Sequence, residues 1–533
     1  MATSQETMNP VLSKLTAHVG SEHVLIDEAS RRLHSQDIYS RGETIVAVVQ
    51  PATTEELAAC LHDLTAAGHS VIPRGAGMSY TGGYLAVNDD SVVIDMQRMN
   101  RVLEINTEDM YVTVQCGCTW QALHEALSDT GLRTPFWGTL SGIHATVGGG
   151  LSQNGIFWGS GRFGTALDSV LSLEVVLADG TVVPTGSAAR QNGTPFFRHY
   201  GPDLTGLFCA DTGALGFKAT ATLKLIDQMP ARRYASFDFD SASDLQAAMS
   251  ELSRRSLPME CFGFDPFLQS QRMQRESLLK DVKSFGNMLK AAGSVGKAVK
   301  EGAKVAMAGR RFMDNVHYTL HLVFEERDEA SAQSSLEQAQ AICREHSARE
   351  IDNSIPKILR ANPFTPLNNV VGPKGERWGP VHTIIPHSKA GAGIAAVEAV
   401  FEKYQALVDE HDIGVGYLYA TIANNGFVIE PVFFWPDAIN ELHEQTVESA
   451  ILKKLPGFER NTAARDAVGT IRAALVDAFV EMGGVHMQIG KSYRFADAHH
   501  TDSYALLERI KAAVDPEHRV NPGSLGLGAS QSP

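Results

Sequence analysis

The stretch PFWGTLSGIHATVGGGLSQNGIFWGSGRFG, residues 135–164, decides the fold class of this 533-residue chain. Nine of its thirty positions are glycine, and Gly148, Gly149 and Gly150 stand in a row. An ordinary loop needs no such density, whereas a backbone that closely approaches a large flat or charged ligand does, because glycine has no side chain to intervene. We therefore predict a ligand-binding segment here, followed by a strand over 170–177.

Two other glycine segments flank this one. The first, VIPRGAGMSYTGG at 71–83, is a strand that enters a loop whose N–H groups could face a pyrophosphate. A Rossmann fingerprint would need glycine at position 80 and then a helix, but Tyr80 stands there and a strand over 92–95 follows. The third is GALGF at 213–217, before a strand over 220–225. The Rossmann fold is therefore excluded.

In this order and spacing, the three segments resemble the flavin domain of the vanillyl-alcohol oxidase / p-cresol methylhydroxylase (PCMH) superfamily. The ending with Asp515-Pro516 and Asn521-Pro522-Gly523 resembles the family's C-terminal return to the flavin. The resemblance implies an α+β fold: a PCMH-type FAD-binding domain of two α+β subdomains, with an inserted α+β substrate cap whose antiparallel sheet is flanked by helices. The expected boundaries are 1–228 for the FAD-binding domain, 229–470 for the cap and 471–533 for the return.

The resemblance implies one FAD per chain. The residues expected to contact it are Arg74, Gly75, Ala76, Gly77, Met78, Ser79, Gly82, Pro135, Gly138, Thr139, Leu140, Gly142, Thr146, Val147, Gly149, Asn154, Gly155, Gly216, Phe217, Arg494 and Asn521. Members that bind flavin covalently use a His in the first loop, a Cys in the second segment or a His before a cap strand. Here these places hold Met78, no cysteine within 135–164, and no histidine within 425–429. We expect non-covalent FAD.

Four residues are candidates for the chemistry. Tyr493-Arg494 resembles the pair that binds the phenolate and supports the reduced flavin in phenol-oxidising members. Glu430 lies in the apolar strand 428–434, where burial would raise its pKa and suit proton transfer. His382 lies in a cap strand of the kind that faces the flavin, and Tyr417 and Tyr419 alternate so that both could line an aromatic pocket.

The favoured function is an FAD-dependent oxidase or dehydrogenase that oxidises a small aryl alcohol or para-substituted phenol by hydride transfer to flavin N5. One alternative is a D-2-hydroxy-acid dehydrogenase of the lactate or glycolate type. Many members of that branch bind a metal through a His-x6-His pair and a Glu-His, which are absent here, so we expect no metal. The other alternative is a non-redox FAD-dependent alkyl transferase of the ether-lipid type.

Composition limits the partners. The formal net charge of −15 argues against nucleic acid, and the six scattered cysteines fit a reducing cytoplasm. Oxygen, a redox protein or a quinone is the expected electron acceptor, and a homodimer is considered. The basic segment 280–311 suggests a peripheral contact with a membrane or a partner. The alternative is that it is a solvent-exposed loop of the cap domain.

Overall fold

The computed structural model describes residues 2–278 and 318–528. The basic segment 280–311 therefore lies outside the described residues. The chain divides into two compact units. Unit 1 comprises residues 1–155, 165–227 and 486–533, and unit 2 comprises 156–164 and 228–485. Among the described helices, none is long and apolar enough to cross a membrane.

Unit 1 contains two larger sheets. The first has the strand order β1 (Val24–Leu25), β2 (Ala47–Val49), β4 (Val92–Asp95), β3 (Val71–Arg74). The second is antiparallel and has the order β5 (Val102–Asn106), β6 (Tyr111–Gln115), β10 (Phe217–Lys224), β8 (Val170–Val176), β9 (Val182–Pro184). A small pair joins β7 (Leu132–Arg133) to β11 (Ile226–Asp227). The helices are α1 (Ala2–Val19), α2 (Glu28–His34), α3 (Thr54–Ala66), α4 (Trp120–Ala126), α5 (Val147–Gln153), α7 (Leu204–Leu207), α19 (Phe495–Ala498) and α20 (Thr501–Val514).

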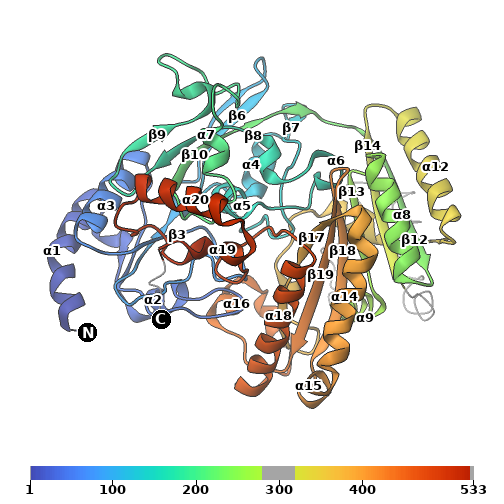
Figure 1. Cartoon of the computed structure of the whole chain (residues 1–533). Coiled ribbons are helices and arrows are strands. Elements are labelled where there is room, and N and C mark those ends of the chain that lie inside the picture. Colours follow the sequence, from blue (N-terminus) through green and yellow to red (C-terminus); the bar gives the residue numbers. More distant parts are fainter. Residues whose placement is uncertain (1, 279–317, 529–533) are drawn as a thin grey trace. The chain divides into compact units, whose positions relative to one another are not determined.

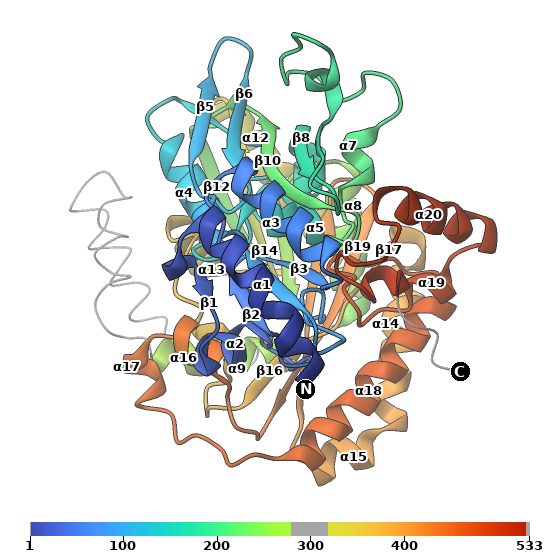
Figure 2. The same ribbon diagram turned by 90° about the vertical axis from the view of Figure 1, so that its left-hand side faces the viewer.

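Helix α3 shows how the sequence builds this unit. Its N-cap Thr53 accepts a hydrogen bond of 3.2 Å from the backbone N–H of Glu56. Its leucines at 57, 61 and 64 recur at helical spacing and are fully buried in one core cluster with strands β2, β3 and β4. Helix α1 packs along α3 on the outer side (Figure 2).

Unit 2 is built on one large antiparallel sheet (Figure 1). Its order is β15 (Arg349–Ile351), β12 (Ala231–Phe239), β14 (Tyr318–Glu326), β13 (Glu260–Phe264), β18 (Gly414–Ile422), β19 (Gly426–Trp435), β16 (Arg377–Pro380), and β17 (Thr383–Pro386) also pairs with β19. The helices are α6 (Ser160–Phe163), α8 (Ala242–Arg254), α9 (Pro266–Leu278), α12 (Glu329–Glu345), α13 (Ser354–Ala361), α14 (Ala390–Lys403), α15 (Gln405–Glu410), α16 (Glu441–Thr446), α17 (Ser449–Leu452) and α18 (Thr462–Glu481). The predicted antiparallel sheet with flanking helices is confirmed.

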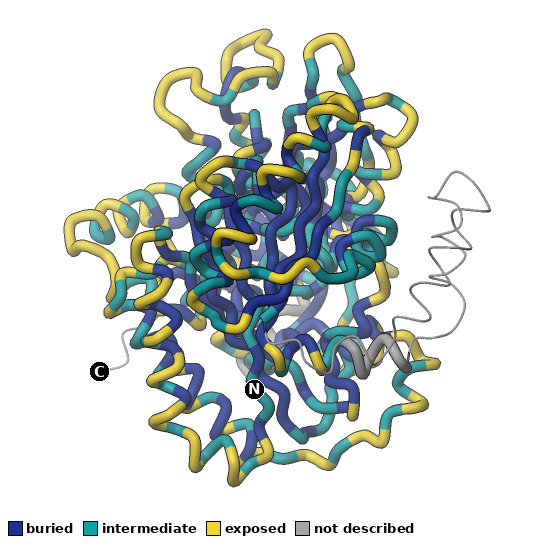
Figure 3. Tube along the Cα trace, turned by 90° about the vertical axis from the view of Figure 1, so that its right-hand side faces the viewer, coloured by how far each residue is buried: buried dark blue, intermediate teal, exposed yellow. Residues whose placement is uncertain are grey.

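Helices α8 and α14 cover one face of this sheet. Phe401 of α14 lies 5.9 Å from the ring of Tyr417 and 5.7 Å from that of Phe433. Every residue of β19, an interior strand of this sheet, is buried. Figure 3 colours the chain by burial, with buried residues in dark blue and exposed residues in yellow. Side chains of β19 therefore lie in protein on both faces of the sheet.

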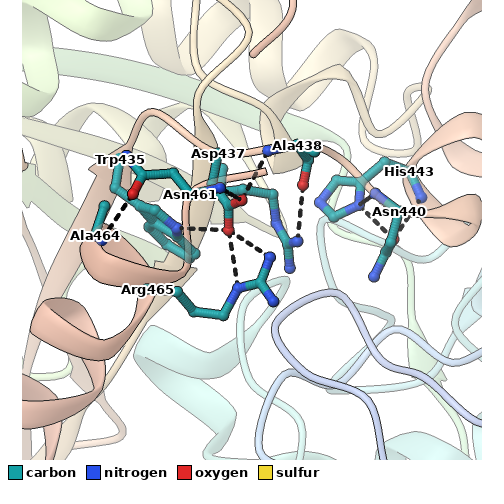
Figure 4. Close-up of polar contacts among 9 residues, drawn as sticks. Trp435, Asp437, Ala438, Asn440, His443, Asn461, Ala464 and Arg465 are labelled. Carbon is teal, nitrogen blue, oxygen red and sulfur yellow. Dashed lines mark hydrogen bonds and ion pairs between the residues drawn. The ribbon is translucent and has the colours of Figure 1, made fainter. Parts of the chain in front are cut away.

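Asp437, just after β19, anchors the start of α18 (Figure 4). Its fully buried carboxylate accepts hydrogen bonds from the side chain of Arg465, at 2.6 and 2.9 Å, and from the backbone N–H of Asn461, at 2.8 Å. Asn461 in turn caps α18 by accepting from the N–H of Ala464 at 3.0 Å. One buried charge thus fixes the end of a strand to the first turn of a helix.

Asp437→Asn is expected to destabilise the protein by about 2–4 kcal/mol, because the amide cannot satisfy the Arg465 cation that the carboxylate now holds. A thermal melt should show a clear drop in Tm. The control is Asp466→Asn, an exposed position on the same helix, where a change below about 0.5 kcal/mol is expected. An equal change in Tm for the Asp437 and Asp466 variants would contradict the proposal that Asp437 anchors α18.

Candidate functional site

The first glycine loop leaves β3 at Arg74, whose guanidinium lies against the loop at Gly77. The buried guanidinium donates to the backbone oxygen of Gln36 at 2.9 Å and lies 4.7 Å from the centroid of the Tyr84 ring. Gly77 has a φ of +75°, and a Cβ there would come within 2.3 Å of the Arg74 Nη2 atom. The side chain of Arg74 therefore braces the loop, and the loop offers its backbone to a ligand.

The same loop is held from its other end. The Tyr84 hydroxyl donates to the backbone oxygen of Ser79 at 2.7 Å, and Asp37 accepts from the N–H of Gly82 at 2.8 Å. The hydroxyls of Ser79 and Thr81 lie 3.1 Å apart. Burial raises the pKa values of both Asp37 and Tyr84. Hydrogen bonds from Tyr84 and Asp37 therefore hold the loop in this conformation.

The three consecutive glycines of α5 serve different purposes. A Cβ at Gly148 would lie 2.7 Å from Cys116 Cβ, and one at Gly150 would lie 2.8 Å from Trp120 Nε1. A Cβ at Gly149 would meet only its N-cap, Thr146 Oγ1, at 3.1 Å. Packing thus explains the first and third glycines, and Gly149 alone leaves open space beside the start of the helix.

Thr146 also joins the two glycine segments. A Cβ at Gly75 would lie 2.5 Å from the Thr146 hydroxyl, so the first loop runs directly past the N-terminal end of α5. That hydroxyl accepts from the N–H of Gly149 at 3.2 Å. The structure therefore brings together two of the three predicted cofactor segments.

Two buried amide oxygens at the other end of α5 have no hydrogen-bond partner: Gln153 Oε1 and Asn154 Oδ1. Asn154 ends the helix in the left-handed conformation, with a φ of 55°. Buried polar atoms are nearly always satisfied. FAD carries N–H and O–H donors as well as phosphates, so these oxygens and the space at Gly149 fit it.

The C-terminal return is hydrogen-bonded to the first glycine loop. Asn521 Nδ2 donates to the backbone oxygens of Gly83 at 2.7 Å and Thr212 at 2.8 Å. Lys491 Nζ donates to the backbone oxygen of Leu85 at 2.6 Å and to Asn521 Oδ1 at 3.0 Å. Burial lowers the pKa of Lys491 to about 7, although the Asp37 charge opposes this shift. Asn521, a predicted cofactor residue, thus connects three chain segments that are distant in sequence.

The other predicted cofactor residues fall into three groups. Thr139 and Gly142 form a turn closed by a 3.0 Å backbone hydrogen bond, and a Cβ at Gly155 would lie 3.2 Å from Thr139 Cγ2. Gly216 lies against Val175, and the Phe217 side chain is in the hydrophobic core. The remaining positions lie in the glycine segments already described, partly or fully buried: Ala76, Met78, Pro135, Gly138, Leu140 and Val147.

Tyr493 and Arg494 differ in environment. The Tyr493 ring is buried and stacks on His486, with centroids 3.9 Å apart. Arg494 is exposed and forms the N-cap position of α19. Stacking on His486 therefore fixes the Tyr493 ring.

In unit 2, the register of the sheet brings Glu430 and His382 together. Pro380 pairs with Val432 and Thr383 pairs with Ile429, so the register is the same on both sides of the gap between β16 and β17. Continued through the gap, it places His382 directly opposite Glu430, and the N–H of Val381 donates to Pro431 at 3.0 Å. Opposite residues of an antiparallel pair share one face of the sheet.

Alternation defines what else lies on this face. Glu430 pairs with Leu418, Leu418 with Phe264, and His321 with Phe262. We call these five residues, together with His382, the Glu430 face; they lie opposite the face covered by α8 and α14. Tyr417 and Tyr419, which we expected to line a pocket, stack 6.1 Å apart on the helix-covered face.

The titratable groups of the Glu430 face are shifted by burial. Burial raises the pKa of Glu430 to about 7, with the positive charge of Arg272 opposing the shift. Burial also lowers the pKa of His321 to about 3, so this ring is neutral; its Nδ1 lies 2.9 Å from Ser236 Oγ. The expected burial and raised pKa of Glu430 are therefore confirmed.

Sequence reasoning missed His321 and Arg272. His321 is a polar residue within the apolar strand β14, which is the same signal that singled out Glu430. Arg272 carried no such signal, because one arginine on a helix such as α9 is ordinary. Among the described residues, no group of three or more His, Cys, Asp or Glu could hold a metal ion.

Comparison with known proteins adds an identification to this geometry. Residues 45–186 match the FAD binding domain family. This range includes the first two glycine segments, 71–83 and 135–164. The chain carries an FAD-binding domain. The predicted cofactor, FAD, is thereby confirmed.

Over 212 residues the chain is 30% identical to D-lactate dehydrogenase [cytochrome] 1, mitochondrial, of Saccharomyces cerevisiae, but this match spans 39% of the chain and 35% of the relative. The fold of the whole chain is similar to p-cresol methylhydroxylase, with a TM-score of 0.74, 16% identity, and 98% and 97% of the two chains covered. It is also similar to 4-ethylphenol oxidase from Gulosibacter chungangensis, with a TM-score of 0.71, 17% identity and the same coverage. The predicted PCMH-type fold is confirmed.

Gly149→Ala is expected to lower FAD affinity at least about tenfold, since its Cβ enters the space beside Thr146, while the apoprotein keeps its Tm. Titration of apoprotein with FAD, followed by flavin fluorescence, measures the affinity. The matched control is Gly148→Ala, whose Cβ would strike Cys116 and should lower the Tm of the apoprotein. Unchanged FAD affinity in the Gly149 variant would remove this glycine from the cofactor site.

Proposed function

We propose that this protein is an FAD-dependent oxidoreductase that oxidises a small aryl alcohol or para-substituted phenol. The observation that carries the proposal is the pair of Glu430 and His382 on one face of the unit 2 sheet. A carboxyl with a pKa of about 7 lies there among phenylalanine and leucine side chains. Such a surface suits an aromatic substrate that must lose a proton near neutral pH.

The residues have separate roles in this proposal. When bound, FAD supplies the two-electron oxidant, which takes a hydride from the substrate carbon. Glu430 accepts the proton of the substrate hydroxyl. His382 lies opposite Glu430 and orients that carboxyl, while the apolar neighbours keep water away from it. Tyr493 is proposed to contact the substrate oxygen, and Arg494 to stabilise negative charge on the reduced cofactor.

A second candidate is oxidation of a D-2-hydroxy acid. The specific observation in its favour is the 30% identity to a D-lactate dehydrogenase over 212 residues, which are 39% of the chain. The proton acceptor would again be Glu430, so the two candidates differ in the substrate and not in the base. The third candidate is alkyl transfer without net oxidation, for which neither an aryl alcohol or phenol nor a D-2-hydroxy acid would be the substrate.

We propose that FAD is held without a covalent bond, because Met78 occupies the first-loop position and the segment 135–155 contains no cysteine. Acid precipitation should then leave a colourless pellet and a yellow supernatant.

Oxygen, a redox protein or a quinone is the proposed electron acceptor of the reduced flavin. The six cysteines are unpaired, which supports a reducing cytoplasm.

The proposed function is tested by mixing the flavoprotein anaerobically with panels of aryl alcohols, para-substituted phenols and D-2-hydroxy acids. Bleaching of the flavin absorbance by the aromatic panels is expected. Bleaching by hydroxy acids alone would replace the first candidate with the second, and no bleaching by any panel would favour the transferase. Arg494→Ala should slow the bleaching by about 10²-fold or more if this arginine supports the reduced cofactor.

Glu430 as the base predicts a pH profile. The acceptor is the carboxylate, so kcat/KM should rise tenfold per pH unit up to about pH 7 and level off above it. Glu430→Gln should lower kcat by about 10²–10⁴-fold and remove this limb of the profile.

The matched control is Glu410→Gln, at an exposed glutamate of the same unit. This variant should keep the wild-type kcat and the wild-type pH profile of kcat/KM. An acidic limb that persists in the Glu430 variant would assign the base elsewhere.

A further inference from the structure

Lys491 of the C-terminal return lies along the first glycine segment. Its backbone N–H donates to the oxygen of Thr81 at 2.9 Å, and its Cβ lies 3.8 Å from where a Cβ of Gly82 would be. Its amine donates to the backbone oxygen of Leu85 at 2.6 Å and to Asn521 Oδ1 at 3.0 Å. An amine is thus held beside the loop whose backbone is offered to the cofactor.

Unit 1 has two other lysines in its interior, and each of them has a carboxylate partner. Lys218 Nζ lies 2.6 Å from Asp211 Oδ1, and Lys511 Nζ lies 2.5 Å from Asp515 Oδ2. Among the described residues, no carboxylate forms an ion pair with Lys491, whose amine contacts a peptide oxygen and an amide oxygen. A cation that is taken out of water is normally paired with an anion. The contrast indicates that Lys491 binds an anion that the chain does not supply.

The protonation state of this amine decides how many hydrogen bonds it can donate. A neutral amine has two N–H groups, and the oxygens of Leu85 and Asn521 accept two hydrogen bonds from Lys491. An ammonium has three N–H groups, so protonation adds a donor for which the described residues provide no acceptor. Burial of the amine lowers its pKa to about 7. The charge therefore changes near neutral pH, and only the charged form has a further donor.

Three other ionisable groups lie around the first glycine segment: Asp37, Tyr84 and Arg74. The Asp37 charge raises the pKa of Lys491 and so opposes the effect of burial. The carboxylate of Asp37 accepts from the N–H of Gly82 at 2.8 Å, and burial raises its own pKa. Tyr84 keeps its proton at neutral pH, because burial raises its pKa well above the ordinary value, and Arg74 acts on Asp37 and Tyr84. A negative charge that a ligand brings to the loop would therefore raise the pKa of Lys491.

We propose that protonated Lys491 binds the diphosphate of FAD, and that FAD binding transfers a proton from solvent to this amine. The diphosphate carries the fixed negative charge of oxidised FAD, whose flavin ring is neutral. The first glycine segment offers this group backbone N–H dipoles, and Lys491 adds a full positive charge. The inference concerns cofactor binding and holds for each of the candidate substrates.

The first test measures the affinity of the apoprotein for oxidised FAD between about pH 6 and 9. The wild-type affinity should be constant below about pH 7 and fall by up to about tenfold per pH unit above it, because binding must then protonate the amine. Lys491→Arg is charged at every pH and should remove this fall. Lys491→Met should bind FAD about 10–100-fold more weakly at pH 6, and its affinity should not fall above pH 7.

The second test counts protons by calorimetric titration of the apoprotein with FAD at about pH 8, in buffers of different ionisation enthalpy. Wild type should take up about 0.9 proton more per FAD than Lys491→Arg or Lys491→Met. A lysine that only held the loop in shape would affect the affinity without this difference. The control is Lys14→Met, at an exposed lysine of the same unit, which should match wild type in affinity and in proton uptake.

Three results would overturn the inference. The same pH profile in wild type and Lys491→Arg would assign the titrating group elsewhere, with Asp37 as the first candidate. Equal proton uptake by wild type and Lys491→Met would leave the lysine a structural role only. An unchanged FAD affinity in Lys491→Met, together with a lower flavin reduction potential, would place the amine beside the flavin ring. The Tm of each apoprotein shows whether it is folded, and Lys491→Arg carries both tests if the methionine variant is not.

Discussion

The FAD-binding part of this protein depends on backbone that approaches a ligand without side chains in between. The Thr146 hydroxyl occupies the place where a side chain of Gly75 would be, and it also caps helix α5, which begins at Val147 and contains Gly148 and Gly149. Because one hydroxyl fills the space between two glycines, the first loop and the start of α5 are held side by side. A side chain at Gly75 would strike this hydroxyl and separate the two segments.

Around that contact, the surrounding side chains brace the loops and leave the backbone for the cofactor. Arg74, Tyr84 and Asp37 all direct their polar atoms to backbone groups of the loop or of its neighbours. Fully satisfied polar groups of this kind keep a buried loop in one conformation. The binding surface is therefore preorganised, which reduces the ordering cost of binding.

The sequence predicted the elements well where the pattern is local. Glycine density located the cofactor segments, and the apolar run around Glu430 correctly implied burial. It could not pair Glu430 with His382, because cross-strand register depends on tertiary contacts. The alternation of Tyr417 and Tyr419 correctly predicted that they share a face of the sheet. It could not tell which face, which is the one covered by α8 and α14, and that they line a pocket stays a prediction. Arg272 gave no signal, because its role comes from where α9 docks on the sheet.

The contacts of Asn521 and Lys491 have a consequence for biosynthesis. The loop at 79–85 leaves the ribosome well before the groups that hydrogen-bond to it, which follow more than 400 positions later in the chain. Unit 2 is translated almost entirely in the interval. The cofactor pocket is therefore completed after the sheet of unit 2 has been synthesised, and the cell must hold the first glycine loop in an unfinished state until then.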